Sequence, residues 1–329
     1  MHDQHYPSVE QMVAMSAGEL ADVDPVVMNL VVARGIPMLA SLDVQRYVDI
    51  ADEWANNLAS RLPALEKQFY QSPEHWRNDV AFFRLGLVCW YLDVIQGVAY
   101  WEDQRNLSSG MTYTDPSHLF LHGVMDDRRG TCANMSLLNM VIGRRLGLDV
   151  SLACLDTHFL CRYERGAVVH NIETTSAGKG GFSSSSDAEL LAEFNLPRKA
   201  QDCGSDPRAL TPHQLLGVFI GLRARHLDDT HRYAEANRDY LLARYLFPNN
   251  RYLYISQDQV SVQQSIELFE PGEKGHPIEV CASMRLLVEL APWERRQSAT
   301  CTSAHQSENL NGSCIDAVFA QVHPGDQWL

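Results

Sequence analysis

The spacing of apolar residues predicts that the first third of the chain is helical. Over residues 44–70, apolar side chains recur every three to four positions, the pattern of a helix with one buried face. Pro63 lies within this pattern and is expected to kink or divide the helix. The triplet Ser-Pro-Glu at 72–74 has the composition of a helix start, and the helix that it begins should continue to Leu92. Residues 1–120 are therefore expected to be mainly helical.

A buried helix followed by short strands is expected in the centre of the chain. Thr131 is a suitable N-cap, and Gly147 a suitable stop, for the apolar segment 131–146. Short apolar runs then predict three strands, at 150–155, 159–163 and 167–172. A glycine- and serine-rich stretch, 178–186, is expected to be a mobile loop.

The last third of the chain returns to a helical pattern. Over residues 212–250 the small and aromatic positions have the spacing of a tetratricopeptide-type helical hairpin, and the stretch resembles a single such repeat. One repeat cannot bury its own apolar face, so it should pack on the rest of the chain or on a degenerate neighbour within 258–291. The polar tail after Arg296 has no clear period and is expected to be flexible.

Charge and composition exclude several classes of function. The formal net charge of −14 disfavours nucleic acid and acidic membrane surfaces, because phosphate binding requires a basic surface. The longest strongly apolar stretch, 85–92, is far too short to span a bilayer. No CxxC pair occurs among the eight cysteines, which argues against a zinc ribbon. The first residues show no secretory signal, so a reducing cytoplasmic location is expected.

One thiol, one imidazole and one carboxylate follow each other at the expected ends of regular elements. They are Cys132, His158 and Glu173. The first turn of a helix has unpaired amides and the positive end of the dipole, which favour a thiolate at Cys132 and could bind an oxyanion. This order suits a cysteine nucleophile, its base and an acid that orients the base.

Strand geometry tests whether the imidazole and the carboxylate can lie close together. If residues 158–173 form a hairpin with a two-residue turn at 165–166, His158 and Glu173 face each other directly on one side of the sheet. The two-residue period places His170 on the opposite face. A bulge or a three-residue loop would reverse this choice.

These residues resemble a known superfamily. Gly130-Thr131-Cys132 at a helix start, His158 at a strand start and Glu173 on the next strand are similar to the transglutaminase-like superfamily. The resemblance implies a papain-like fold in which a Cys-His-Asp triad performs acyl transfer or amide hydrolysis. It covers residues 80–180 and, more weakly, the hairpin at 212–250.

The resemblance implies a role for each residue. Cys132 would be the nucleophile, His158 the base and Glu173 the third member of the triad. The sequence has Glu173 where most members have aspartate, and Leu160 where an aromatic residue usually follows the histidine by two positions. The segment before Gly147 is similar to bacterial members that carry tetratricopeptide-like helices.

Each candidate residue has a structural and a functional interpretation. Cys132, His158 and Glu173 could each be structural, but their joint order favours catalysis. Asp156 and Asn171 could support the triad. Metal binding is disfavoured for Cys154 and Cys161 with His158, because no motif spacing supports it. His118 and His122 have the i, i+4 spacing that can hold a metal, but no acidic third ligand follows at a recognisable spacing, so surface or packing roles are favoured. Residues 174–175 and 183–186 could line the substrate cleft, or they could form a flexible segment where the chain leaves the hairpin.

The sequence therefore predicts an α+β protein with a papain-like, transglutaminase-like core between helical lobes. The expected parts are a helical lobe at 1–120, a catalytic core at 121–200, a tetratricopeptide-like lobe at 201–295 and a flexible tail at 296–329. The expected function is cysteine-dependent acyl transfer on a peptide or carboxamide bond, without a cofactor or metal. A peptide or protein is the expected substrate, and the acceptor is water or an amine. A non-catalytic peptide-binding scaffold is the alternative.

Overall fold

The computed structural model describes residues 6–101, 112–155, 158–175, 182–194 and 207–268. For residues 265–268 it describes the backbone alone. Contacts divide the chain into two compact units, and the first comprises residues 1–101 and 113–257. The second comprises residues 102–112 and 258–329. The elements that position the site belong to the first unit. The expected division into four parts stays a prediction.

The N-terminal segment is a series of capped helices. They are α1 (Val9–Ala14), α2 (Ala17–Ala21), α3 (Pro25–Ala33), the 3-10 turn η1 (Pro37–Leu39) and α4 (Val44–Gln71). Ser8 and Ser16 form capping boxes at α1 and α2. Pro63 lies inside α4 and does not divide it, contrary to one of the two expected outcomes. Its position is exposed, so water can bind the carbonyl that proline leaves without a partner.

The predicted helix start at Ser72 is wrong in part. Ser72 precedes only a short 3-10 turn, η2 (Pro73–Trp76), and its side chain makes no capping bond. Arg77 and Asn78 then take positive φ values of 56° and 54°, which end that turn. Asp79 caps the true helix, α5 (Val80–Trp90), by accepting a bond from the Ala81 amide. A π-helical turn, η3 (Tyr91–Ile95), follows.

The helix that carries Cys132 begins after a short parallel strand pair. Strand β1 (Ala99–Tyr100) pairs with β2 (Arg129–Gly130). Between them along the chain lie η5 (Pro116–His118) and α6 (Leu121–Asp127). The predicted buried helix is α7 (Cys132–Arg145), and its Thr131 cap is confirmed. Gly147, with φ of 75°, follows the end of α7 as expected.

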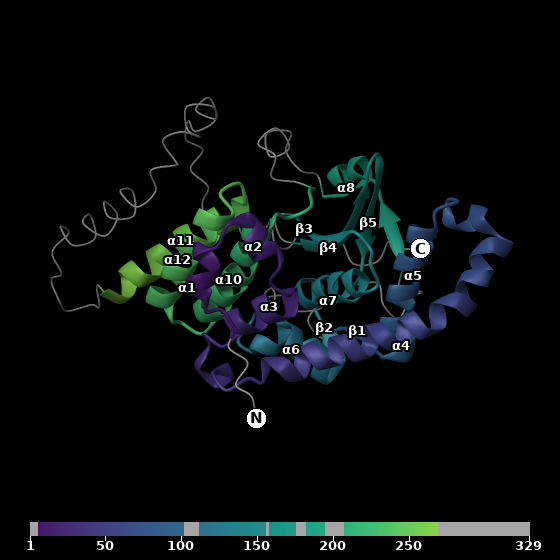
Figure 1. Cartoon of the computed structure of the whole chain (residues 1–329). Helices are drawn as coiled ribbons and strands as arrows, with labels where there is room; N and C mark the ends of the chain where they lie inside the picture. The colour runs from purple at the N-terminus through teal and green to yellow at the C-terminus, as the bar shows by residue number, and fades with distance from the viewer. Residues whose placement is uncertain (1–5, 102–111, 156–157, 176–181, 195–206, 269–329) are drawn as a thin grey trace. The chain divides into compact units, whose positions relative to one another are not determined.

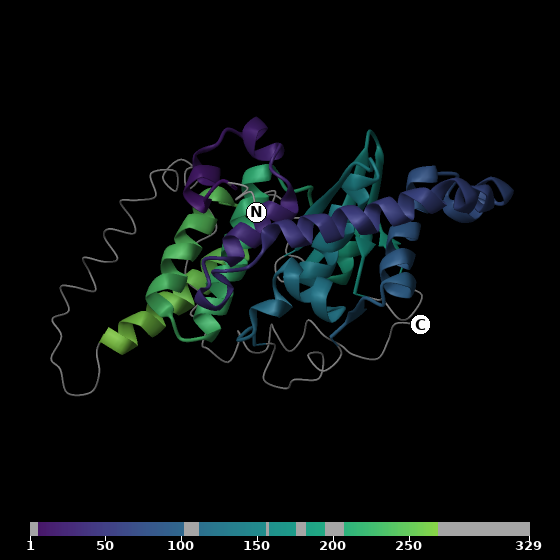
Figure 2. The same ribbon diagram turned by 60° about the horizontal axis from the view of Figure 1, so that its bottom comes forward.

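A four-stranded antiparallel sheet follows α7. Its strands, in spatial order, are β3 (Val150–Leu155), β4 (His158–Arg165), β5 (Val168–Glu173) and β6 (Ser183–Ser185). In Figure 1, α7 lies between this sheet and α4, and α8 (Asp187–Glu193) lies beyond the sheet. The view in Figure 2 also shows the long α4 alongside this layer. The expected α+β core, with a Cys132 helix packed on a small antiparallel sheet, is confirmed.

Two expectations about this sheet are wrong. Residues 183–185, predicted as loop, form β6, because their backbone pairs with the end of β5. The β4–β5 register is shifted by two residues from the expected one, so that Cys161 pairs with Ile172. The turn occupies residues 166–167, which places Gly166, with φ of 62°, at the first turn position. A two-residue hairpin turn of this type needs positive φ there, and glycine meets that need without strain.

The C-terminal part of the first unit contains a helical hairpin. It consists of α10 (Pro212–Asp229) and α11 (Tyr233–Leu246), and α12 (Arg251–Leu268) follows. Helix α10 packs on α11 and also on α2 and α3, so the hairpin buries its apolar face against N-terminal helices. The tetratricopeptide type of this hairpin stays a resemblance. The expected flexible tail lies outside the described residues.

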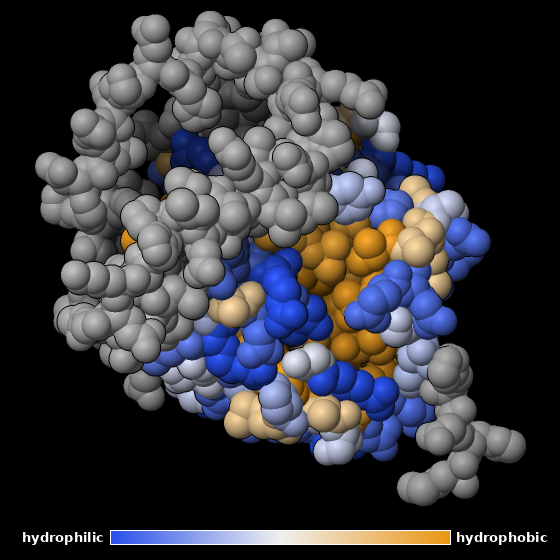
Figure 3. Space-filling view, turned by 90° about the vertical axis from the view of Figure 1, so that its left-hand side faces the viewer, coloured by the Kyte–Doolittle hydropathy of each residue, from blue (hydrophilic) through white to orange (hydrophobic). Residues whose placement is uncertain are grey.

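Large apolar side chains are exposed at several places on the described surface. Figure 3 looks at the side where Figure 1 shows α1, α11 and α12, and there an apolar patch lies among hydrophilic side chains. Tyr245 of α11 and Ile255 of α12 are among the exposed large apolar side chains. Within the described ranges, no helix combines the length and the apolarity that crossing a bilayer requires.

Candidate active site

The start of α7 is held in place by its own cap and by the loop before it. Thr131 is fully buried, and its hydroxyl accepts a bond from the Ala133 amide at 3.3 Å. The same hydroxyl donates to the carbonyl of His118 at 2.8 Å. The cap therefore fixes the first turn of the helix, which contains Cys132, against η5.

Asn134 completes a capping box and extends it. Its side-chain oxygen accepts a bond from the Thr131 amide at 2.9 Å, while its amide nitrogen donates to the carbonyls of Ser117 and Phe120. A side chain at Gly130 would place its Cβ 2.6 Å from that Asn134 oxygen. Glycine is thus required where the chain enters α7, which explains the Gly-Thr-Cys sequence at this position.

Cys132 differs from the other cysteines that the structure describes. Its residue is partly exposed, whereas Cys89, Cys154 and Cys161 are buried. Burial raises the pKa of the Cys161 thiol to about 12 and that of Cys89 further, which makes both thiols inert. Among the described residues, no hydrogen-bond acceptor faces the Cys132 amide, as expected for the first residue of a helix.

His158 and Glu173 form a close pair across the sheet. The Nε2 atom of His158 donates to Oε2 of Glu173 at 2.6 Å. The two side chains are 15% and 29% exposed, so solvent reaches the pair only in part. Both residues project from the same face of the sheet, because a shift of two residues in register leaves the face unchanged.

The second oxygen of Glu173 is also occupied. Oε1 accepts bonds from the amide and the hydroxyl of Thr175, both at 2.7 Å. Burial would raise the pKa of Glu173, but the His158 charge and these hydrogen bonds outweigh it and lower the pKa to about 2. Glu173 is therefore a fixed carboxylate that directs one oxygen at the imidazole.

The thiol also influences the imidazole. Burial disfavours the charged ring, but the Glu173 charge and side-chain hydrogen bonds to Cys132 and Glu173 hold the pKa of His158 well above its usual value. Because Nε2 bonds the carboxylate, Nδ1 is the ring nitrogen left for the thiol. The structure thus brings Cys132, His158 and Glu173 together in the order Cys–His–Glu.

Two residues beside His158 are absent from the sequence-based prediction. The ring of Phe194, at the end of α8, stacks on the imidazole with ring centres 5.6 Å apart and planes at 20°. Phe194 also packs on a small core cluster that includes Leu155 and Leu160. The neighbouring Glu193 carboxyl has a raised pKa because of burial and the nearby Glu173 charge. No local signal could identify them, because only the fold places the end of α8 over the start of β4.

Tyr113 is a further residue near the thiol that the sequence did not indicate. Burial and the Cys132 charge raise the pKa of its phenol well above the usual value. Its backbone is anchored to α10, since its amide donates to Asp229 at 2.7 Å and its carbonyl accepts from Nδ1 of His226 at 2.9 Å. Helix α10 therefore fixes the backbone of a residue whose phenol responds to the charge of Cys132.

The other candidates lie elsewhere or have structural partners. His170 is on the opposite face, as expected, where its Nε2 donates to Asp79 at 3.2 Å. Asn171 bonds Arg162 and Asp187 rather than the triad. Asp156 lies outside the described residues. Within the described ranges, no three His, Cys, Asp or Glu side chains are arranged to hold a metal ion.

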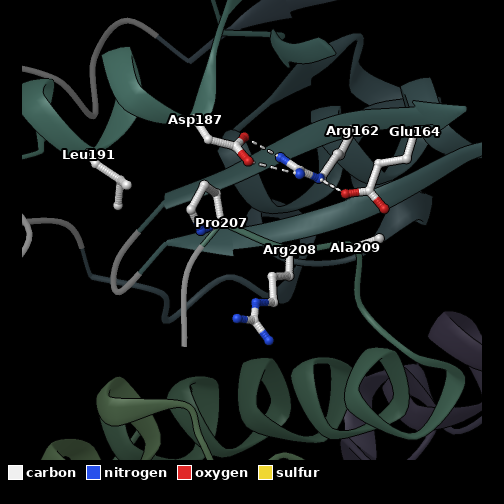
Figure 4. Close-up of a pocket in the computed structure, with 7 residues that line it drawn as sticks. All are labelled: Arg162, Glu164, Asp187, Leu191, Pro207, Arg208 and Ala209. Carbon is white, nitrogen blue, oxygen red and sulfur yellow. Dashed lines mark hydrogen bonds and ion pairs between the residues drawn. The ribbon is translucent and has the colours of Figure 1, made fainter. Parts of the chain in front are cut away.

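The Arg162 cluster lines a cavity that is separate from the triad. Figure 4 shows Arg162 with two bonds to Asp187 and one to Glu164, beside a cavity of about 540 Å³. The Arg162 side chain is 4% exposed, and these carboxylates balance its charge. The cluster therefore joins β4 to the start of α8, the helix whose end carries Phe194.

Part of the chain is similar to known proteins. Residues 98–216 match the sequence model of the transglutaminase-like superfamily. Curated relatives include F-box only protein 21 of Pongo abelii, 24% identical over 201 residues, and of Mus musculus, 23% identical over 209 residues. The matches cover 56% of this chain but only 32% and 33% of those relatives, so the chain spans about a third of their length. No solved structure matches the chain.

The matched segment contains the whole Cys–His–Glu arrangement, together with Tyr113 and Phe194. These two relatives are mammalian, and the bacterial type expected from the sequence stays a prediction. Segment 98–216 of this chain is therefore similar to the transglutaminase-like superfamily.

Proposed function

We propose that this protein is a cysteine-dependent enzyme that acts on a peptide or carboxamide bond through a thioester. The observation that carries the proposal is the His158–Glu173 pair, joined at 2.6 Å, together with the influence of the Cys132 thiol, which helps to raise the pKa of His158. A nucleophile, its base and an orienting acid within bonding reach are what such chemistry requires. The superfamily match supports cysteine-based catalysis in general terms.

The first step forms the thioester. His158 takes the thiol proton, and the Cys132 sulfur attacks the carbonyl carbon of the substrate. The carbonyl electrons move to oxygen, and the amide of Cys132 at the start of α7 stabilises the resulting oxyanion. The oxyanion then collapses, the carbon–nitrogen bond breaks, and the imidazolium gives its proton to the leaving amine.

The second step releases the acyl group. Water or a primary amine gives a proton to His158 and attacks the thioester carbon, and the sulfur leaves as thiolate. Glu173 stabilises the imidazolium in both steps and holds the ring in one orientation, because its other oxygen is fixed by Thr175. Water would make the protein a hydrolase, and an amine would make it a transferase.

The experiment is incubation of the purified protein with a peptide mixture from cells, with and without added methylamine, followed by mass spectrometry. We expect shortened or deamidated peptides without methylamine, or methylamide products with it. Cys132→Ala is expected to abolish all products, whereas Cys161→Ala, which alters a buried inert thiol, should retain them. Unchanged peptides in both samples would contradict catalysis and favour the peptide-binding scaffold.

A further inference from the structure

One buried hydroxyl lies a helical turn after the proposed nucleophile. Ser136 is four residues after Cys132 on α7, one helical turn further along the same side. Its side chain is fully buried. Burying a hydroxyl costs free energy unless it forms hydrogen bonds. Its hydrogen-bond partners therefore show which segments it joins.

The Ser136 hydroxyl has two partners, one on each strand of the hairpin. It donates to the carbonyl of Phe159 at 2.9 Å, and it lies 2.9 Å from the hydroxyl of Thr174. A hydroxyl can donate one hydrogen bond, and Ser136 donates its own to the Phe159 carbonyl. Thr174, itself buried, must therefore be the donor in the second bond.

These partners are the residues adjacent to the base and the acid. Phe159 directly follows His158 at the start of β4, and Thr174 directly follows Glu173 at the end of β5. One oxygen on the helix that carries Cys132 thus joins both strands beside the other two members of the triad. The next residue, Thr175, bonds the Glu173 carboxylate itself.

We propose that Ser136 and Thr174 are positioning residues that set the separation of the thiol from the imidazole and carboxylate. This inference rests on the proposed function. Neither residue touches the reacting atoms. They act by fixing the distance between α7 and the ends of β4 and β5 that carry His158 and Glu173. Displacing a reacting group by about 1 Å can lower a rate by about a hundredfold, so a small relaxation at this junction has a large effect.

The test measures how fast iodoacetamide modifies Cys132 at several pH values, with each cysteine quantified by peptide mass spectrometry. Thr174→Val removes the hydroxyl with little change of shape, and Thr174→Ser retains it. We expect Thr174→Val and Ser136→Ala to lower the Cys132 rate at mildly acidic pH by between about tenfold and a hundredfold. Their profiles should move toward that of an ordinary thiol, while Thr174→Ser keeps the wild-type profile.

A matched control separates positioning from stability. Ser256 is also buried, but it lies on α12, an element that carries no member of the triad. Ser256→Ala should lower stability against urea to an extent similar to Ser136→Ala but leave the Cys132 profile unchanged. If Ser136→Ala does not fold, the two Thr174 variants decide the question alone.

The outcomes separate this inference from the proposed function. A reactive Cys132 in the wild type whose profile is unchanged in Thr174→Val would overturn the positioning role and leave the proposed function intact. A wild-type Cys132 that reacts no faster than the buried cysteines would overturn both. Equal profile shifts in Thr174→Val, Thr174→Ser and Ser256→Ala would show a general loss of packing, and would also overturn the positioning role.

Discussion

The carboxylate of Glu173 reaches His158 along a diagonal of the sheet. The observed register pairs Cys161 with Ile172, and its continuation places Thr175, not Glu173, directly opposite the histidine. Diagonal neighbours on adjacent strands are about 7–8 Å apart, farther than direct partners. The glutamate side chain has one more methylene than aspartate and spans this distance, forming the 2.6 Å bond. The register thus explains why glutamate occupies this position.

Shortening this side chain is expected to break the pair while keeping the charge. Glu173→Asp should lower the rate of Cys132 alkylation at mildly acidic pH by about tenfold or more, because the carboxylate no longer reaches Nε2. The rate is measured with iodoacetamide and peptide mass spectrometry, beside Glu173→Gln as the isosteric, uncharged control. A Glu173→Asp rate equal to that of the wild type would show that direct contact is unnecessary.

The pair also predicts how stability depends on pH. The pKa of Glu173 is lowered from 4.5 to about 2, so its contribution is present above 4.5 and is lost as the pH falls toward 2. The pKa of His158 is raised from 6.5, so its contribution is complete below 6.5 and is lost as the pH rises through the folded value. The difference in the free energy of unfolding between wild type and Glu173→Gln should therefore be largest between pH 4.5 and 6.5. Urea unfolding across the pH range measures this difference, and a difference that is constant with pH would contradict the ion pair.

At the scale of elements, local signals predicted some features and not others. The Thr131 cap, the Gly147 stop and the strand at 150–155 follow from local chemistry, so the sequence identified them. Strand β6 depends on backbone pairing with β5, which a serine run does not reveal. Ser72 and Asp79 are both good caps, and only the positive φ values of Arg77 and Asn78 decide between them.

The site was predictable where it depended on one element and unpredictable where it depended on several. Cys132, His158 and Glu173 lie at the ends of elements that the sequence indicates. The hairpin register was wrong by two residues, yet the face was right, because side chains alternate with a period of two. Phe194 and Tyr113 reach the site through the packing of distant segments, for which the sequence has no local pattern.

The entry into α7 provides a test at the scale of one element. Gly130→Ala would place a Cβ 2.6 Å from both the Asn134 oxygen and the Met135 Cγ atom. We expect a loss of about 1–3 kcal/mol in the free energy of unfolding, and slower Cys132 alkylation, because the cap must shift. The matched control is Gly18→Ala in α2, where the added Cβ meets no atom within 4 Å. That variant should be neutral or slightly more stable.

Urea unfolding and alkylation of both glycine variants give the comparison. Gly130→Ala with wild-type stability and reactivity would show that the close approach at the cap is not important.

In the first compact unit, helices from both ends of the unit support the segment that carries the site. Arg223 of α10 forms a two-bond ion pair with Asp239 of α11, at 2.6 and 2.8 Å, and also donates to the carbonyl of Val32 in α3. Asp229 at the end of the same α10 anchors Tyr113, which lies near Cys132. The C-terminal hairpin and the N-terminal helices therefore share a junction, and α10 also anchors the backbone of Tyr113.

Removing Arg223 is expected to weaken this junction. Each side chain of the Arg223–Asp239 pair is 13% exposed, so Arg223→Ala leaves a largely buried carboxylate without its partner. We expect a loss of about 2–4 kcal/mol in the free energy of unfolding. The double variant Arg223→Ala/Asp239→Ala should lose less than the sum of the two single variants. Urea unfolding measures all three, and additive losses would contradict the pairing.

Activation of Cys132 by His158 is the feature on which the proposed chemistry depends. The most direct measurement is the rate of iodoacetamide modification of each cysteine at mildly acidic pH, in the wild type and in His158→Gln. We predict that Cys132 reacts faster than the other seven cysteines in the wild type, and that His158→Gln slows it to the rate of an ordinary thiol. Uniform slow labelling in the wild type, or an unchanged Cys132 rate in His158→Gln, would contradict this activation.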